Sequence, residues 1–264
     1  MLHAAGPPVP PGLAAEYSSW SWSVVSLHAP NSVTYCLAGA SGETRFLKIT
    51  RTSWTPSAKA ETERLRWARL HLPVPEILGA GGDEEVTWLL TAGLQARDAT
   101  FEPFRADAQK LVRLLGRGLR KFHAIDAGSC PFQFRLDHAL RVAGERLKAG
   151  HIDPARDFHP EHAHLSPAEA VAELVRTRPD TEDLVVCHGD YCPPNLLADG
   201  TEVVGYVDLG ELGVADRWWD LAVATWSVTW NFGPGLETHF LDAYGIEPDE
   251  KRIRFYRLLY DVVS

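Results

Sequence analysis

The stretch that decides the fold spans residues 184–210 and reads LVVCHGDYCPPNLLADGTEVVGYVDLG. It begins with an apolar run, 184–187, that is rich in β-branched residues and is typical of a strand. Two further apolar runs, 196–197 and 203–207, flank Asp199-Gly200, a dipeptide favoured in tight hairpin turns. The sequence therefore predicts a strand, a loop with Asp190 and Asn195, and a hairpin that returns Asp208 towards Asn195.

Three side chains of this stretch have the spacing of a protein-kinase active site. Protein kinases carry a loop Asp that orients the acceptor hydroxyl, an Asn five residues later, and an Asp-Phe-Gly whose Asp holds magnesium. The same interval separates Asp190 from Asn195, and Asp208 opens an Asp-Leu-Gly. Each Asp alone is more often a turn or capping residue. Together they favour Asp190 as the catalytic group and Asn195 and Asp208 as magnesium ligands, with His188 only shaping the loop.

Beyond this stretch the chain resembles the aminoglycoside phosphotransferases, especially the 3'-type that phosphorylates kanamycin and neomycin. The similarity is carried by GELGVADRWWDLAVAT at 210–225, KFHAIDAGSCPFQFRL at 121–136 and FYRLL at 255–259. The resemblance implies an α+β, bilobal, protein-kinase-like fold, with a small β-rich N-lobe and a larger, mainly helical C-lobe. It also implies ATP and magnesium as cosubstrates and transfer to a hydroxyl of a cationic sugar antibiotic, giving resistance.

The N-terminal third offers matching nucleotide-binding residues. Lys48 lies within the apolar run RFLKI, 45–49, as the family's phosphate-binding lysine does, and Glu61 in the next predicted helix is its expected partner. Both types are ordinarily solvated surface residues, and Glu63 lies only two positions beyond Glu61. The expected hinge, 91–93, places Thr91 and Gly93 where backbone groups could bind adenine. The segment HAPNSVTY, 28–35, lacks the family's glycine and aligned serine, which leaves Asn31 or Ser32 as the phosphate donor.

The resemblance and the patterning together predict three segments. Residues 1–15, rich in Pro, Gly and Ala, are expected to form a flexible tail. Residues 16–93 form the nucleotide-binding N-lobe, and residues 94–264 form the catalytic and acceptor-binding C-lobe. Helices are expected at 58–70, 136–148, from 167 onwards and at 218–230.

The expected acceptor pocket departs from the family. Asp157 precedes the segment HPEHAH, 159–164, and Glu161 lies within it; this segment is expected to be a solvated loop. Glu211 stands where 3'-type members usually have Arg, and Trp230 stands where they have an acid. The altered C-terminus keeps only Asp261 as a carboxylate side chain. These five residues are the candidates for substrate contacts. Because they include fewer acids than the family's pocket, an acceptor with fewer positive charges remains an alternative.

Composition narrows the remaining choices. The net charge of −9 argues against a nucleic-acid or anionic-membrane partner. The resemblance implies a small-molecule substrate, and a monomer or homodimer is expected. No signal-peptide pattern opens the sequence, which favours a cytoplasmic location and four reduced cysteines. The alternatives are a kinase of the same fold for another hydroxylated metabolite, a catalytically silent nucleotide-binding module, and a metal-dependent hydrolase, for which Lys48 would have no use.

Overall fold

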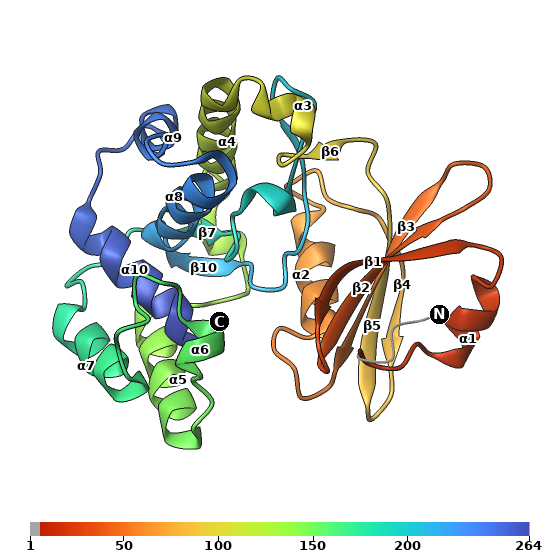
Figure 1. Cartoon of the computed structure of the whole chain (residues 1–264), viewed down its shortest axis with the longest axis horizontal. Helices are drawn as coiled ribbons and strands as arrows, with labels where there is room; N and C mark the ends of the chain where they lie inside the picture. Colours follow the sequence, from red (N-terminus) through yellow and green to blue (C-terminus); the bar gives the residue numbers. More distant parts are fainter. Residues whose placement is uncertain (1–5, 264) are drawn as a thin grey trace. The chain divides into compact units, whose positions relative to one another are not determined.

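The computed structural model describes residues 6–263, which form two compact units (Figure 1). The first unit extends to Ala96 and also contains Gly205–Glu211, whereas the second comprises Arg97–Val204 and the chain from Leu212 onwards. The sequence placed the boundary at residue 93 and assigned 205–211 to the C-terminal part. The chain instead returns to the first unit there, which brings Asp208 to Lys48.

The first unit is built on a five-stranded antiparallel sheet in the order β1-β2-β3-β5-β4. Apolar and polar residues alternate along the strands, and the inward set, including Val33, Tyr35 and Leu47, is fully buried. Helix α2 contacts β3, β4 and β5. The strands and α2 are β1 (Ser21–His28), β2 (Ser32–Ala38), β3 (Thr44–Arg51), α2 (Ala58–Ala68), β4 (Ile77–Gly82) and β5 (Val86–Ala92).

The start of the chain is not the loose tail that its composition predicted. Pro11–Glu16 form helix α1, opened by a proline at its first position, where the missing N–H costs nothing. Leu13 and Tyr17 are buried in the same apolar cluster as the sheet residues Val33 and Ile49. Burial of these two side chains outweighs the low helix propensity of the surrounding prolines and glycines. Residues 1–5 of the predicted tail lie outside the described part.

The second unit is mainly helical. Helix α8 (Trp218–Phe232) is deeply buried, since every residue from 218 to 228 is buried. Helix α7 (Pro167–Thr177) begins at the predicted cap, where Ser166 and Glu169 form a capping box. The other helices of four or more residues are α3 (Glu102–Arg105), α4 (Ala108–Phe122), α5 (Leu136–Ala149), α6 (Pro154–Asp157), α9 (Glu237–Tyr244) and α10 (Glu250–Val263).

Residues 184–210 contain short strands that pair with one another or with neighbouring segments. Strand β7 (Leu184–Cys187) pairs antiparallel with β10 (Gly213–Asp216). Strands β6 (Arg97–Asp98), β8 (Leu196–Ala198) and β9 (Val203–Tyr206) form a small sheet in the order β6-β8-β9. The predicted strand, loop and hairpin are therefore all present, and the α+β class with a β-rich first unit and a helical second unit is confirmed.

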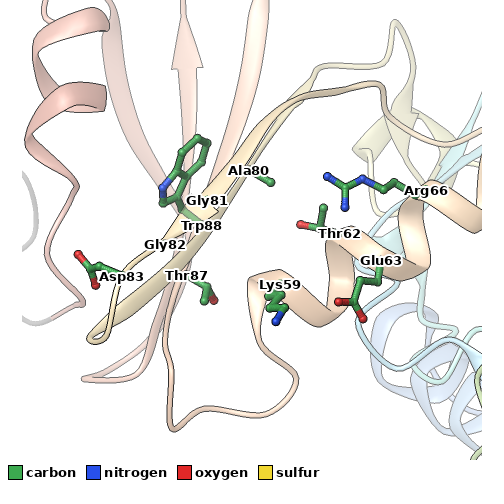
Figure 2. Close-up of a pocket in the computed structure, with 10 residues that line it drawn as sticks. All are labelled: Lys59, Thr62, Glu63, Arg66, Ala80, Gly81, Gly82, Asp83, Thr87 and Trp88. Atoms are coloured by element: carbon green, nitrogen blue, oxygen red, sulfur yellow. The ribbon is translucent and has the colours of Figure 1, made fainter.

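A cavity of about 380 Å³ lies in the first unit, between α2 and the β4–β5 pair (Figure 2). Lys59, Glu63 and Arg66 line it at helical spacing, on the side of α2 opposite Glu61. On the sheet side Trp88 lies against Gly81, where a side chain would collide with the indole ring. The predicted site residues do not line this cavity, so it is separate from the candidate site.

The structure bears on membrane crossing and on disulfide formation. Across residues 6–263, none of the helices combines the length and the apolar character that crossing a membrane requires. Within the described residues, Cys36, Cys130, Cys187 and Cys192 form no disulfide bonds.

Candidate active site

Asp190 and Asn195 lie together in the loop that follows β7. The Asn195 side-chain amide donates to the Asp190 carboxylate oxygen Oδ2 at 2.8 Å and to the Asp190 backbone carbonyl at 3.1 Å. The short 3-10 helix Pro193–Asn195 sets this spacing, because its prolines fix φ just before the asparagine. Both hydrogen bonds use the amide nitrogen of Asn195. A cation would therefore be bound by the amide oxygen.

The carboxylate of Asp220 anchors this loop through hydrogen bonds. The sequence did not indicate a functional role for Asp220. Its carboxylate, fully buried in α8, accepts hydrogen bonds from the backbone N–H groups of His188 at 2.7 Å and Gly189 at 2.9 Å. It also accepts one from His123 Nε2 at 3.0 Å. A buried carboxylate requires such partners. The signal in the sequence was an acid inside an otherwise apolar helix, WWDLAVATW.

His188 shapes the loop, as expected from the sequence. Its ring is fully buried beside Phe122 and Tyr191, and its Nδ1 accepts the backbone N–H of Asp190 at 3.3 Å. Nearby, His123, Cys187 and Asp220 could geometrically hold a metal ion. However, Asp220 is already committed to three N–H donors, and burial raises the pKa of the Cys187 thiol well above its usual value. This cluster is therefore structural.

In the first unit, Lys48 bridges two carboxylates. Its ammonium group lies 2.7 Å from Glu61 Oε2 and 2.6 Å from Asp208 Oδ1. Burial alone would lower the pKa of Lys48, but the negative charges of Asp208 and Glu61 outweigh it and raise that pKa, so Lys48 is protonated. Burial raises the pKa of Glu61, which Lys48 opposes. The predicted partnership of Lys48 with Glu61 rather than Glu63 is the one observed.

Asp208 has an unusual backbone. Its φ of 58° makes it the one non-glycine residue with positive φ among residues 6–263. Asp and Asn adopt this left-handed conformation more readily than other side chains do. The conformation coincides with a carboxylate that is 47% exposed and that pairs with Lys48 through Oδ1. A carboxylate exposed to this extent is accessible to a cation from solvent.

The predicted nucleotide contacts at Thr91, Gly93 and Ser32 are less favourable than expected. Ser32 is buried at the start of β2, between His28 and Thr50 in the sheet register, so its hydroxyl is not presented as a phosphate donor. Thr91 is buried within β5. The Gly93 N–H donates to the Thr44 carbonyl at 2.8 Å, so adenine could use it only by breaking that bond. Gly93 itself is required because a side chain there would collide with Thr44.

Three of the predicted substrate-binding acids are already paired within the second unit. Asp157 accepts from Arg156 at 2.6 Å and is also bonded to Arg146 and to the backbone of Asp153. Glu161 lies 3.4 Å from Arg257. Asp261 is fully buried, which corrects its assignment as a direct substrate contact. Glu211, the remaining candidate acid, belongs to the first unit and is partly buried.

Asp261 organises a loop that the sequence read as solvated. It accepts from His159 through the backbone N–H at 3.0 Å and Nδ1 at 2.5 Å, and from His162 Nδ1 at 2.7 Å. His162 is consequently buried. These bonds span about a hundred residues of sequence and could not be read from local pattern. The loop is therefore fixed to α10, not free in solvent.

An aromatic ledge, defined here as Trp226, Trp230 and His159, lies beside this loop. The His159 ring stacks on Trp230 with centroids 4.4 Å apart and an interplanar angle of 14°, and Trp226 lies 4.9 Å from Trp230. Trp230 is 51% exposed, whereas Trp226 is buried. The predicted contact residue Trp230 therefore presents a rigid aromatic surface to solvent.

Asp261 gives a testable dependence of stability on pH. Burial alone would raise the pKa of Asp261, but the hydrogen bonds from His159 and His162 outweigh it and lower that pKa below the usual value. A lowered folded-state pKa stabilises the protein above the unfolded-state pKa and ceases to do so as the pH falls through the folded-state value. We expect Asp261→Asn to lower the free energy of unfolding by about 2 to 3 kcal/mol at pH 7.

The measurement is chemical denaturation of both proteins at pH 7 and under acidic conditions, with the difference shrinking below a pH of about 4. Asp242→Asn, the same change at an exposed position of α9, is the control and should leave the free energy of unfolding unchanged. A difference between Asp261→Asn and the native protein that stays constant down to the lowest pH would contradict an ionised Asp261.

Comparison with known proteins gives the same picture as the motifs. The model of the "Phosphotransferase enzyme family" matches residues 21–256. An aminoglycoside 3'-phosphotransferase from Niallia circulans is 37% identical, covering 81% of this chain and 82% of its own length. One from Streptomyces fradiae is 34% identical, covering 94% and 97%. Streptomycin 3''-kinase from Streptomyces griseus is 33% identical, covering 82% and 84%.

Solved structures agree with these relatives. The crystal structure of an aminoglycoside-3'-phosphotransferase of type VIII superposes with a TM-score of 0.86 at 34% identity and covers 95% of this chain and 96% of its own. An aminoglycoside phosphotransferase from Streptomyces rimosus, solved with ADP and streptomycin, has a TM-score of 0.78 at 26% identity and covers 96% of both chains. The kinase-like fold and the resemblance noted in the sequence are thereby confirmed, and the chain is an enzyme that belongs to the aminoglycoside phosphotransferase family.

Proposed function

We propose that the protein transfers the γ-phosphoryl group of ATP to a hydroxyl of an aminoglycoside antibiotic, most simply in the 3' manner of its relatives, and so confers resistance. The observation that carries the proposal is the Asp190 carboxylate, held by Asn195 on a loop that is anchored to a buried helix. Phosphoryl transfer needs alignment and charge neutralisation more than covalent chemistry. A fixed carboxylate at this point suits the orientation of an acceptor hydroxyl and receipt of its proton.

Magnesium and ATP are part of this proposal. The Asn195 amide oxygen and the Asp208 carboxylate are hard oxygen donors of the kind that magnesium prefers. Asn195 uses its amide nitrogen in the bonds to Asp190, and the Asp208 carboxylate is 47% exposed. When bound, magnesium supplies neutralisation of the phosphate charges. Lys48, protonated and kept in place by Glu61, is suited to bind phosphate oxygens of the nucleotide.

Replacing Lys48 tests the nucleotide part separately. We expect Lys48→Met to raise the KM for ATP by roughly 10- to 100-fold, because a charge-assisted contact is worth about 1.5 to 3 kcal/mol. The measurement is steady-state kinetics with ATP varied at saturating acceptor. Lys59→Met, on the opposite side of α2, is the matched control and should leave this KM unaltered. An unchanged KM in Lys48→Met would exclude Lys48 from the nucleotide site.

The direct test is ADP release by the purified protein with ATP and magnesium, in the presence of kanamycin, neomycin, streptomycin or no acceptor. Turnover that depends on one of these acceptors, with the phosphorylated product seen by mass spectrometry, would support the proposal. ATP binding with no stimulated turnover for any acceptor would count against an aminoglycoside substrate.

Three acidic side chains of the second unit are already paired within the protein, and this favours a second class of acceptor molecule. Asp157, Glu161 and Asp261 are paired with arginines or hydrogen-bonded to histidines of the chain itself, so they are less available to substrate ammonium groups. The exposed face of Trp230 instead suits a planar cation or an apolar sugar face. Streptomycin, which carries planar guanidinium groups, fits this description. A kcat/KM for streptomycin above those for kanamycin and neomycin would select this class.

A further inference from the structure

We infer that Tyr260 of α10 is a positioning residue for Asp190, an assignment that rests on the proposed phosphotransferase function. The Tyr260 hydroxyl donates to Asp190 Oδ1 at 3.3 Å, while the Asn195 amide donates to Oδ2 at 2.8 Å. Both oxygens of the carboxylate therefore accept a hydrogen bond, one from Asn195 in the same loop and one from Tyr260 in α10. Tyr260 thus contributes to the orientation in which Asp190 meets the acceptor hydroxyl.

Two anchors matter because of the way that an Asp side chain rotates. The terminal torsion of Asp is broad, so a single hydrogen bond to one oxygen leaves the carboxylate plane free to turn. A second donor on the other oxygen fixes that plane. The Tyr260 bond is long for an O–H···O contact, as catalytic hydrogen bonds often are before substrate is bound. It is consequently a restraint on orientation and not a source of strong binding.

The hydroxyl is delivered from a rigid position. The Tyr260 ring packs on Trp219 with centroids 6.2 Å apart, and the Trp219 indole N–H donates to the Gly189 carbonyl at 2.7 Å, next to Asp190. The following residue, Asp261, is fixed by His159 and His162. The same turn of α10 is therefore tied to the catalytic loop on one side and to the 159–162 loop on the other.

A phenol is the kind of side chain that this contact needs. The Tyr260 hydroxyl can donate to the Asp190 carboxylate. A carboxylate at residue 260 could not donate to Asp190 and would repel it if both were charged.

The test compares Tyr260→Phe with Tyr256→Phe in the full-length protein. Both changes remove one hydroxyl from α10, and the Tyr256 ring packs on the same Trp219 with centroids 6.4 Å apart, so the pair differs in the contact with Asp190. The readouts are kcat, the KM values for ATP and acceptor, and the thermal unfolding temperature without substrates, using the acceptor with the highest turnover in the panel.

For Tyr260→Phe we expect kcat to fall by about 5- to 20-fold, because small misalignments of reacting groups are costly, with both KM values within about twofold and an unfolding temperature equal to that of the native protein. Tyr256→Phe should retain the native kcat. A rise in the KM for acceptor at constant kcat would instead make Tyr260 a substrate contact, and an equal fall in kcat in both variants would make its role structural. Either result, or a native kcat in Tyr260→Phe, would overturn the inference.

Failure of this inference is distinguishable from failure of the proposed function. If the native protein shows no acceptor-dependent turnover, the proposed substrate is wrong. If the native protein is active and Tyr260→Phe is equally active, the function stands and the Tyr260 assignment does not.

Discussion

Asp190→Ala is expected to lower kcat by about 10²- to 10⁴-fold, the range in which a positioned general base contributes, and to leave the affinity for ATP within about twofold. The carboxylate contacts Asn195 and Tyr260 in the structure, and no role in holding the nucleotide is proposed for it. The measurements are steady-state turnover with the preferred acceptor and equilibrium binding of ATP with magnesium.

The control for this experiment is Asp180→Ala, which removes an exposed carboxylate of the same unit. It should behave like the native protein in both measurements. If Asp190→Ala kept more than a tenth of the native kcat, the assignment of Asp190 as the catalytic group would be wrong. A parallel loss of ATP binding and of the thermal transition would show misfolding, in which case Asp190→Asn, which keeps the shape, takes its place.

Asp220→Asn is expected to lower the free energy of unfolding by about 3 kcal/mol and kcat by at least tenfold. The carboxylate accepts two backbone N–H groups of the loop that carries Asp190, and an amide can replace only one of its oxygens. The other N–H would then face an NH₂ group in a fully buried setting, which costs about 1 to 3 kcal/mol, and His123 would lose its charged partner. The displaced loop carries Asp190, so activity falls as well.

Asp216→Asn is a matched control because Asp216 is also buried and also accepts backbone N–H groups, from Asp183 and Trp218, together with Arg252. It should lose similar stability while keeping a nearly native kcat at temperatures where it is folded. Denaturant unfolding and turnover at 20 °C separate the two effects. Equal kcat values in Asp216→Asn and Asp220→Asn would show that Asp220 has no special effect on the loop.

The parts of the site that the sequence predicted are those held by local structure. Asp190 and Asn195 lie five residues apart within one loop, and a proline-rich turn closes that interval, so pattern alone places them together. Asp208 follows from the hairpin at Asp199-Gly200. The pairing of Lys48 with Glu61 joins a strand to the next helix, which is still a short-range relation.

The parts that the sequence could not predict depend on contacts between distant segments. From the sequence, Asp261 was expected to be an acid near the C-terminus that contacts substrate. In the structure the 159–162 loop packs against α10, and both carboxylate oxygens of Asp261 are hydrogen-bonded to His159 and His162. The role of Asp220 could not be predicted because it depends on the position of β7 relative to α8. Ser32 looked like a loop residue because the register of β1, β2 and β3, which buries it, is set by the whole sheet.

The left-handed backbone at Asp208 determines how its role can be studied. Alanine at this position would remove the carboxylate and also place an ordinary side chain in a conformation that costs about 1 kcal/mol or more. A loss of activity in such a variant would mix the two causes. Asparagine tolerates this conformation and differs mainly in charge, so it is the replacement through which the contribution of the negative charge can be isolated.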